Sequence, residues 1–380
     1  MVMNLTVDYP ELTGSAIAEA RKLIGVPLRR YPGFTEATRG SIMNWARSIG
    51  DRNPLYMDDY HGRLSRYGGL IAPPLWLYAI DDTIVSPKLP GIHCIYGAVD
   101  WEFFKIVRMG DTFTTEVCVA DVIEKQSEFC GRMVMQVGEV KYYNQKKELV
   151  AKASPKILRT PRKAAQGKNK YGEIQKHHYT REELTALEDS VDEEKWQGAI
   201  IRYWEDAQEG ELLTPIVRGP LSSEDVKLFI QNTNPVKSYR RFMQYLERHP
   251  LCAFKDPASN IWEGWENQLL DDKVAKSMGF PFAHDCGLQR VAILSNLVTN
   301  WMGDDGFLVK FGVELNLPWI YGDTMYCKGK VTRKYEENGR HLVDLQIWGE
   351  NQSGVALTAN GYATVELISK SARDDERKLV

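Results

Sequence analysis

The segment SIGDRNPLYMDDY, residues 48–60, holds the side chains best suited to acid–base chemistry. It combines a carboxyl at Asp51, an amide at Asn53 and a phenol at Tyr56. A carboxyl accepts a proton and a phenol donates one, so this set suits proton transfer. The alternative is a turn alone, because Gly50 can end a helix and Asp-x-Asn-Pro forms an Asx turn. The elements around the segment must decide between the two.

The chain repeats part of its own pattern at a nearly constant spacing. Gly-Asp-Thr occurs at 110–112 and again 212 residues later at 322–324. Segments 68–80 and 279–293 correspond through Ala72 and Ala283, which are 211 residues apart. One offset shared by two separated motifs indicates an internal duplication.

Each half of the duplication has the same order of elements. Near-alternating strand patterns with Gly and Asn turns follow each Gly-Asp-Thr, and EENGRH is a hairpin signal. An apolar helix is predicted before each one, at 74–84 and 288–303. Because both helices are apolar around much of their circumference, we expect a sheet to wrap around each.

We therefore expect two domains joined by a linker. The first is residues 1–159, the linker is 160–205, and the second is 206–380 with an insert at about 236–280. The linker is polar, and Thr180-x-x-Glu183 has capping-box form, which predicts a surface helix over 181–194.

Composition argues against several function classes. The net charge of −3 and pI near 6.2 provide no basic field for nucleic acid or an anionic membrane. We see no secretory signal and no apolar stretch of membrane-spanning length, so a cytoplasmic location is expected. The six Cys lack CxxC spacing, and HExxH, P-loop and GxSxG motifs are absent. Neither a metal nor a redox cofactor is expected.

Three segments together resemble a known family. GDRNPLY resembles the motif Gly-Asp-x-Asn-Pro-(Leu/Ile)-His of MaoC-like R-specific enoyl-CoA hydratases, and YGGLIAPP resembles the family's Gly-Gly-x-Ile-Ala-His-Gly segment. NWMGDDGFL, residues 300–308, is similar to the acyl dehydratase branch. The resemblance implies an α+β double hotdog, in which two antiparallel sheets each wrap around a long central helix.

The resemblance also implies a reaction and roles for residues. Family members add water across the C2–C3 double bond of an enoyl-CoA thioester, or remove it. The motif's Asp acts on the water, its His shares the proton transfer, and backbone N–H groups near the central helix hold the thioester oxygen. The implied residues are Asp51 and Asn53 in catalysis, with Gly69, Ile71, Ala72 and Arg66 binding the substrate. CoA enters as part of the substrate.

The sequence departs from the family pattern in both halves. Tyr56 occupies the His position of the motif, and Pro73-Pro74 stand where the family has His-Gly, although Pro has no N–H to donate. In the second half, Asn232 or Thr233 falls near the motif's Asp and Lys237 near its His.

The second half nevertheless keeps a histidine where the family has Ala-His-Gly. His284 follows Ala283 there and precedes Asp285. We therefore add His284 and Asp285 to the catalytic candidates, as part of a composite site with Asp51 and Tyr56.

Three functions follow from these residues. The first is a hydratase or dehydratase of lipid metabolism acting on an enoyl-CoA with a bulky or long acyl group. The second is a non-catalytic thioester-binding subunit of a MaoC-like hetero-oligomer, favoured by the missing motif His. The third is a hotdog acyl-CoA thioesterase. Because hotdog sheets leave an edge and a helix face that commonly pair, a homodimer or a hetero-oligomer is expected.

Overall fold

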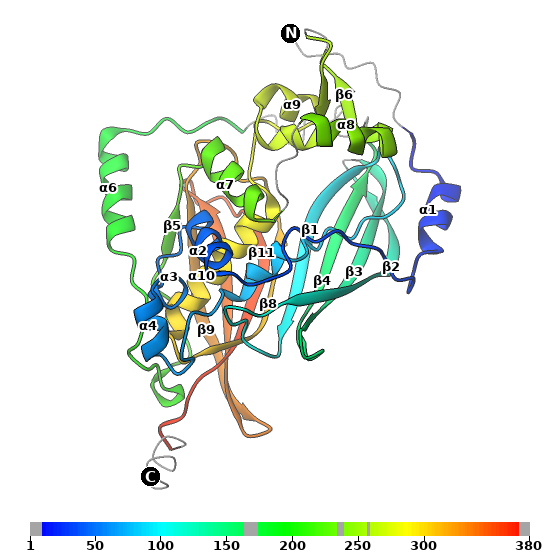
Figure 1. Cartoon of the computed structure of the whole chain (residues 1–380). Coiled ribbons are helices and arrows are strands. Elements are labelled where there is room, and N and C mark those ends of the chain that lie inside the picture. The colour runs from blue at the N-terminus through cyan, green and yellow to red at the C-terminus, as the bar shows by residue number, and fades with distance from the viewer. Residues whose placement is uncertain (1–9, 129, 163–173, 234–238, 257–258, 372–380) are drawn as a thin grey trace.

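One antiparallel sheet of nine strands runs through the molecule (Figure 1). The computed structural model describes residues 10–128, 130–162, 174–233, 239–256 and 259–371. The strand order is β2-β3-β4-β1-β8-β11-β10-β9-β5. The strands are β1 (His93–Phe103), β2 (Phe113–Ser127), β3 (Gly131–Asn144), β4 (Leu149–Thr160), β5 (Ile216–Arg218), β8 (Phe307–Leu315), β9 (Met325–Glu337), β10 (Arg340–Asn351) and β11 (Thr358–Glu366).

The two halves meet in the middle of this sheet. β1 and β8 pair from Ala98–Glu314 to Glu102–Lys310, which joins the four strands of the first half to those of the second. The expected two sheets are therefore continuous, because each half offers an edge strand whose unpaired backbone groups the other satisfies. The predicted hairpin is present between β9 and β10, with Asn338 and Gly339 in the left-handed region.

The second half wraps its sheet around a long helix, as expected. Helix α10 (Gly287–Met302) is buried at every position from Leu288 onward. It ends at Gly303, whose φ of 71° suits glycine. A helix that is apolar around most of its surface is stable only inside such a wrapping.

The first half differs from the expected long helix over 74–84. Only a short 3-10 helix forms there, η1 (Pro74–Ala79). The backbone N–H of Thr83 then bonds to the Asp81 carboxylate, and Thr83 takes a φ of 56°. Arg30 fixes the same turn through ion pairs with Asp81 and Asp82, each at 2.7 Å. These polar contacts end the helix early, although its apolar residues are buried as predicted.

The remaining elements cover the sheet and its helices. The first half also contains α1 (Gly14–Arg21), α2 (Arg39–Ser48), α3 (Pro54–Met57) and α4 (Asp59–Leu64). The linker contains α6 (Arg181–Asp192), which has the predicted capping box, and η2 (Trp204–Asp206) and α7 (Ser223–Thr233) follow it. The predicted boundaries at 159 and 205 fall at the end of β4 and within η2.

The insert forms a small unit above the sheet. It comprises α8 (Tyr239–Arg248), η3 (Pro250–Cys252), β6 (Ala253–Lys255), β7 (Trp262–Gly264), η4 (Trp265–Leu269) and α9 (Asp272–Ser277). Phe254, Trp265, Val274 and Met278 form its own small core, with Phe280 packed against it. Lys237, one of the residues compared with the family motif, lies outside the described residues.

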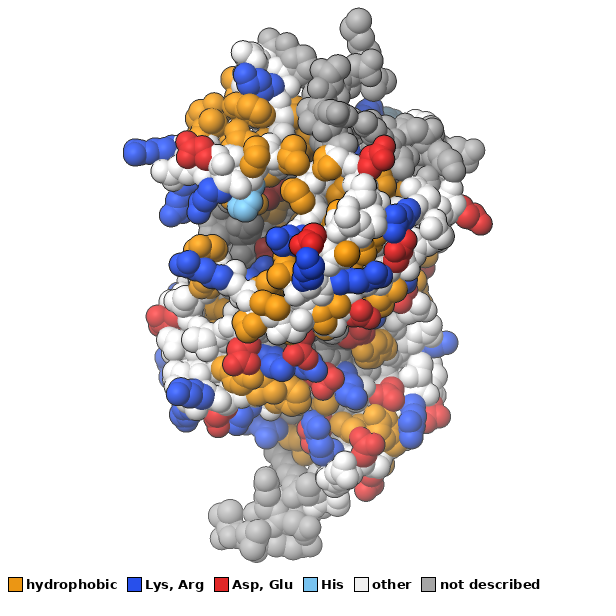
Figure 2. Space-filling view, turned by 90° about the vertical axis from the view of Figure 1, so that its right-hand side faces the viewer, with side chains coloured by type: hydrophobic (Ala, Val, Ile, Leu, Met, Phe, Trp, Pro, Cys, Tyr) orange, Lys and Arg blue, Asp and Glu red, His pale blue; other side chains and the backbone are white. Residues whose placement is uncertain are grey.

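Two observations concern helix length and surface charge. No helix in the described part of the chain is long and apolar enough to span a membrane. On the face shown in Figure 2, positive and negative side chains are interspersed, and the face is hollowed near its upper end beside a histidine.

Candidate functional site

The loop that carries the hydratase-like motif is held by local hydrogen bonds. Helix α2 ends at Ser48, and the N–H of Asp51 donates to the Ala46 carbonyl at 2.8 Å. Asp51 Oδ1 accepts the N–H of Asn53 at 2.9 Å, which is the predicted Asx turn. Asn53 in turn caps α3 by accepting the N–H of Leu55. The turn and the functional interpretation are therefore compatible, because the turn points the carboxyl inward.

The second half holds this loop in place through Arg218. Its guanidinium donates to the carbonyls of Ile49 at 2.8 Å and Gly50 at 3.0 Å, directly before Asp51. It also pairs with Glu194 at 2.6 Å and donates to Asn296 on α10. Gly50 has a φ of 69°, and a Cβ there would lie 2.7 Å from Arg218 Nε. The loop therefore requires glycine at this position.

Asp51 has the electrostatics of a proton-transfer group. It is only 1% exposed, and its Oδ2 has no hydrogen-bond partner within the described residues. Burial raises the pKa of Asp51 to about 7, an effect that the Asn53 N–H and the Arg218 charge only partly offset. A carboxyl with this pKa is partly ionised at neutral pH, so it can both accept and release a proton.

Tyr56 lies beside this carboxyl and is suited to donating a hydrogen bond. It is fully enclosed, with Thr299 of α10 among its polar neighbours. Burial, together with the nearby charges of Asp51 and Asp304, holds the pKa of Tyr56 well above its usual value. Its hydroxyl stays protonated at neutral pH, so Tyr56 can orient a water but cannot act as a base.

The structure adds an acid–base pair that the sequence analysis did not select. His61 Nε2 lies 2.6 Å from Asp304 Oδ2, and Asp304 is only 4% exposed. Asp304 Oδ1 has no partner among the described groups, and the Tyr67 hydroxyl donates to the Asp304 carbonyl. The available signal was a histidine five residues after Tyr56 together with an Asp in the segment resembling the dehydratase branch.

A small cavity adjoins Tyr56 and Asp304. Its volume is about 30 Å³, and Tyr56, Tyr67, Ile71, Ala72 and Asp304 are among the residues that line it. We call it the motif cavity. A space of this size can hold a water molecule, but it cannot hold a thioester without opening.

In the predicted thioester-binding segment, one backbone N–H already donates a hydrogen bond within the protein. The N–H of Ala72 donates to the Val107 carbonyl at 2.9 Å, so it is not free to bind a thioester oxygen, contrary to our expectation. Because Pro73 and Pro74 have no N–H, the remaining candidate donor in this segment is Ile71, which lines the motif cavity.

The other two predicted binding residues lie toward the surface. Gly69 packs closely on α4, since a Cβ at Gly62 would lie 2.8 Å from the Gly69 carbonyl carbon. The Arg66 side chain is 52% exposed and donates weakly to the Asp305 carbonyl at 3.3 Å. It also pairs with the Asp305 carboxylate at 3.9 Å and lies over the Tyr67 ring, so a ligand would compete with these contacts.

The structure does not bring His284 and Asp285 to Asp51. These two residues precede α10, whereas Asp51 faces Asn296 in the middle of that helix. Nine residues of helix separate Gly287 from Asn296, which corresponds to about 14 Å. Both oxygens of Asp285 are held by Arg290 at 3.0 Å, and the Trp319 N–H also donates to it.

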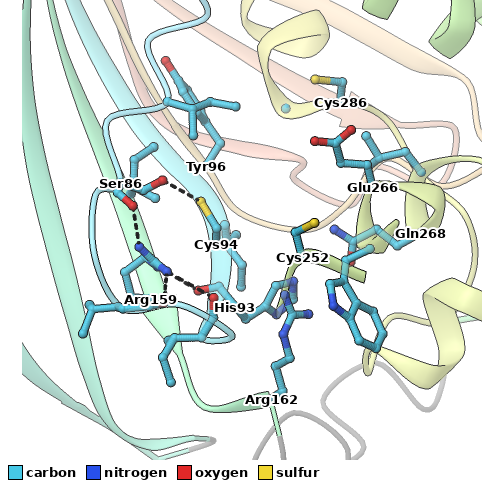
Figure 3. A pocket seen from close by; sticks show the side chains of 18 of the residues that line it. Ser86, His93, Cys94, Tyr96, Arg159, Arg162, Cys252, Glu266, Gln268 and Cys286 are labelled. Carbon is cyan, nitrogen blue, oxygen red and sulfur yellow. Dashed lines mark hydrogen bonds between the residues drawn. The ribbon is translucent and has the colours of Figure 1, made fainter. Parts of the chain in front are cut away.

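His284 instead faces a much larger cavity under the insert. This cavity has a volume of about 690 Å³ and lies between the start of β1, the start of α10 and the insert. Figure 3 shows side chains from these elements facing one another across it, among them His93, Cys252, Gln268 and Cys286. We call it the insert cavity. Within the described residues, no group of three or more His, Cys, Asp or Glu side chains could hold a metal ion.

Solved structures of similar fold cover nearly the whole chain. A MaoC-like dehydratase matches 93% of this chain and 99% of its own, with a TM-score of 0.63 at 13% identity. A MaoC-like dehydratase from Phytophthora capsici gives 0.54 over 92% of this chain and 99% of its own, at 12% identity. A conserved hypothetical protein of Mycobacterium tuberculosis, described as a double hotdog, gives 0.51 over 88% and 93%, at 10% identity. The fold is therefore a double hotdog.

Sequence comparisons match part of the chain. A model of the FAS1-like dehydratase domain region matches residues 22–153. A UPF0336 protein of Streptomyces avermitilis is 31% identical over 123 residues, which cover 30% of this chain and 79% of that protein. The chain belongs to the MaoC-like dehydratase family. A 3-hydroxybutyryl-CoA dehydratase of Methylorubrum extorquens is 26% identical over 91 residues, 24% of this chain and 58% of that enzyme.

These matches support hydratase or dehydratase chemistry in general terms. The family model covers residues 22–153, which include Asp51 and Tyr56, and the matches do not identify an acyl group.

Proposed function

We propose that the protein catalyses the reversible hydration of an enoyl-CoA thioester, with the chemistry at Asp51. The observation that carries the proposal is a buried carboxyl with a pKa of about 7 and one unpaired oxygen, located in the hydratase-like motif. A buried carboxyl without a full set of partners is costly to keep, which supports a role in catalysis.

The proposed proton transfers follow from the protonation states. In the hydration direction, ionised Asp51 removes a proton from a water as its oxygen bonds to C3. Tyr56, which stays protonated, donates a hydrogen bond that orients this water. The proton is then returned to C2, and the pKa near 7 lets Asp51 take part in both steps. The motif cavity has room for the water.

The thioester needs a donor for its oxygen and a site for the CoA phosphates. The Ile71 N–H is the proposed donor, because negative charge develops on that oxygen during addition. Arg66 is the proposed phosphate contact at the surface. Since the motif cavity is closed to a thioester, binding must move the residues that line it.

The acyl group, oligomeric state and location belong to the same proposal. A relative of Mycobacterium tuberculosis with a 33-residue match is named a 3-oxo-4,17-pregnadiene-20-carboxyl-CoA hydratase alpha subunit, which favours a bulky acyl group here. We propose a homodimer or hetero-oligomer in the cytoplasm, and no cofactor beyond the CoA of the substrate.

A non-catalytic thioester-binding subunit is the second candidate. It is favoured by the combination of Pro73-Pro74, the occupied Ala72 N–H and the 30 Å³ motif cavity, which together leave little room for a thioester. In that case the chain would stabilise a catalytic partner of the same family.

The deciding experiment is an assay of the purified protein with a panel of enoyl-CoA substrates. The panel runs from crotonyl-CoA to long-chain, branched and ring-bearing acyl groups, and the loss of the conjugated thioester absorbance reports hydration. Turnover that disappears in Asp51→Asn supports the proposal. Binding without turnover supports the subunit, and release of free CoA thiol without hydration supports a thioesterase.

A further inference from the structure

The insert cavity has the walls of a site for an apolar molecule. Ile92, Phe280, Leu288, Leu315 and Leu317 are among its lining residues. The insert closes it from one side, where Tyr245, residues 248–252 and several residues of η4 line it opposite β1 and the start of α10. Its volume of about 690 Å³ lies within the range of protein sites for small organic molecules.

Two buried histidines point polar atoms into this apolar space. His93 is 2% exposed and His284 is 8% exposed, and both line the cavity. The ring of Phe280 lies against both, with centroid distances of 5.5 Å to His93 and 4.4 Å to His284. Within the described residues, His284 Nε2 has no hydrogen-bond partner, and Gln268 is the polar side chain next to His93.

The hydrogen bond at the other nitrogen determines what His284 can bind. Its Nδ1 lies 2.9 Å from the Asp285 carbonyl, and a carbonyl can only accept, so Nδ1 carries the proton. Burial lowers the pKa of His284, which keeps the ring neutral and leaves Nε2 a bare acceptor. Gln268 also lines the cavity, next to His93, which can donate to it. The bare acceptor at His284 is suited to a donor from a ligand.

The buried charged side chains of the wall have partners within the protein. Arg159 donates to the carbonyls of Leu89, Ile92 and His93 and to Gln136. Arg162 donates to the Gly91 carbonyl at 2.9 Å, and Asp285 and Arg290 form an ion pair at 3.0 Å. A charged ligand would have to lose its water on entering this space, which is costly.

We propose that the insert cavity is a second ligand site, for an uncharged, mostly apolar molecule whose hydroxyl donates to His284 Nε2. The apolar body lies against Phe280 and the leucine side chains.

The insert cavity is separate from the motif cavity. It contacts β1 from His93 to Tyr96, whereas the motif cavity contacts the same strand at Phe103. The seven residues between Tyr96 and Phe103 span about 23 Å of strand. A ligand in one cavity therefore need not affect the other.

Three molecules with one skeleton test the proposal. 9-Fluorenol has a hydroxyl donor, 9-fluorenone has only an acceptor, and fluorene has neither. Equilibrium dialysis against the full chain measures each Kd. We expect saturable binding of one 9-fluorenol per chain, at least about tenfold tighter than 9-fluorenone or fluorene, because only the hydroxyl satisfies the bare acceptor.

Two variants locate the site. His284→Phe should weaken 9-fluorenol to the level of fluorene, and Cys252→Trp should abolish binding of all three by filling the cavity. If His284→Phe does not fold, as judged by circular dichroism and Tm, Cys252→Trp still tests the location. Asp51→Asn should bind 9-fluorenol as the wild type does, which separates this proposal from the proposed function.

Several results would overturn the proposal. They are equal affinity for 9-fluorenol and fluorene, no saturable binding of any of the three, or unchanged binding in Cys252→Trp. Competition by crotonyl-CoA would instead place the insert cavity on the substrate path and refute a separate site.

Discussion

Each half contains the same pair of backbone hydrogen bonds, which we call the backbone frame. The two frames lie beside different sites. In the first half, Met109 donates to the Leu70 carbonyl and Ala72 donates to Val107. In the second half, Tyr321 donates to Ala283 and Asp285 donates to Trp319 in the same pattern. Each frame stands beside the start of η1 or α10 and borders one of the two cavities.

The cavities lie at opposite ends of the central strand pair. The motif cavity adjoins the end of β1 and the start of β8, and the insert cavity adjoins the start of β1 and the end of β8. One has a carboxyl of raised pKa near a 30 Å³ space, and the other has neutral histidines around 690 Å³. Duplication has thus placed a buried carboxyl and a large cavity at separate positions of one sheet.

The largest expected effect tests whether chemistry belongs to the first half. Asp51→Asn should lower kcat/KM for enoyl-CoA hydration by about 100-fold or more while the fold is kept, because the amide preserves the Asx turn but cannot accept a proton. Asp59→Asn, at an exposed ion pair with Arg39, is the matched control and should keep its activity. Equal rates in wild type and Asp51→Asn would move the chemistry away from this loop.

The second expected effect concerns the contact between the halves. Arg218→Met should lower the free energy of unfolding by about 3–5 kcal/mol, because it leaves Glu194 buried without its partner. Arg340→Met, which removes a more exposed pair with Glu366, should cost about 1 kcal/mol or less. Urea unfolding measures both, and similar losses would contradict a special role for Arg218.

The third expected effect is the dependence on pH. Since the pKa of Asp51 is raised from 3.8 to about 7 in the fold, ionisation of this group destabilises the protein as pH rises from about 4 to 7. The free energy of unfolding of Asp51→Asn, minus that of the wild type, should therefore increase by up to about 4 kcal/mol between pH 4 and 7. Above pH 7 this difference should stay constant. Thermal unfolding between pH 5 and 8 measures this, and wild-type hydration should rise through about pH 7. A constant difference would refute the raised pKa.

The smallest expected effect concerns the residue that replaces the motif histidine. Tyr56→Phe should lower kcat by about tenfold, because it removes a donor that orients water without removing the base. Tyr142→Phe, which removes a buried hydroxyl bonded to the Asp81 carbonyl, should leave kcat unchanged. A loss as large as that of Asp51→Asn would show that Tyr56 takes a direct part in proton transfer.

The sequence predicted local features more accurately than it predicted which residues of the two halves correspond. The capping box at Thr180, the Asn338-Gly339 hairpin and the helix over 287–302 depend on neighbouring residues, and all are present. The duplication was recognised, but the backbone frame pairs Ala72 with Asp285, an offset of 213 instead of the 211 inferred from Ala283. His284 is thus the counterpart of Ile71.

The expectations that the structure did not confirm all depend on contacts between residues far apart in the sequence. The predicted first helix was shortened to η1 because Asp81 and Asp82 bond to Arg30, a residue about fifty positions away. The composite site of Asp51 and His284 did not form because α10 separates them. His61 and Asp304 were not paired beforehand because 243 residues lie between them.

The sequence by itself determined the family, the double hotdog, and the turn that presents Asp51, because these depend on residue types and short-range spacing. Only the tertiary structure decided the pKa of Asp51, which burial and the Glu194 charge of the linker raise and the Arg218 charge of the second half only partly offsets. It also decided that the large cavity lies beside His284 and away from Asp51. The physical reason is that desolvation, cavity volume and charge pairing depend on distances in space, which residue spacing along the chain does not specify.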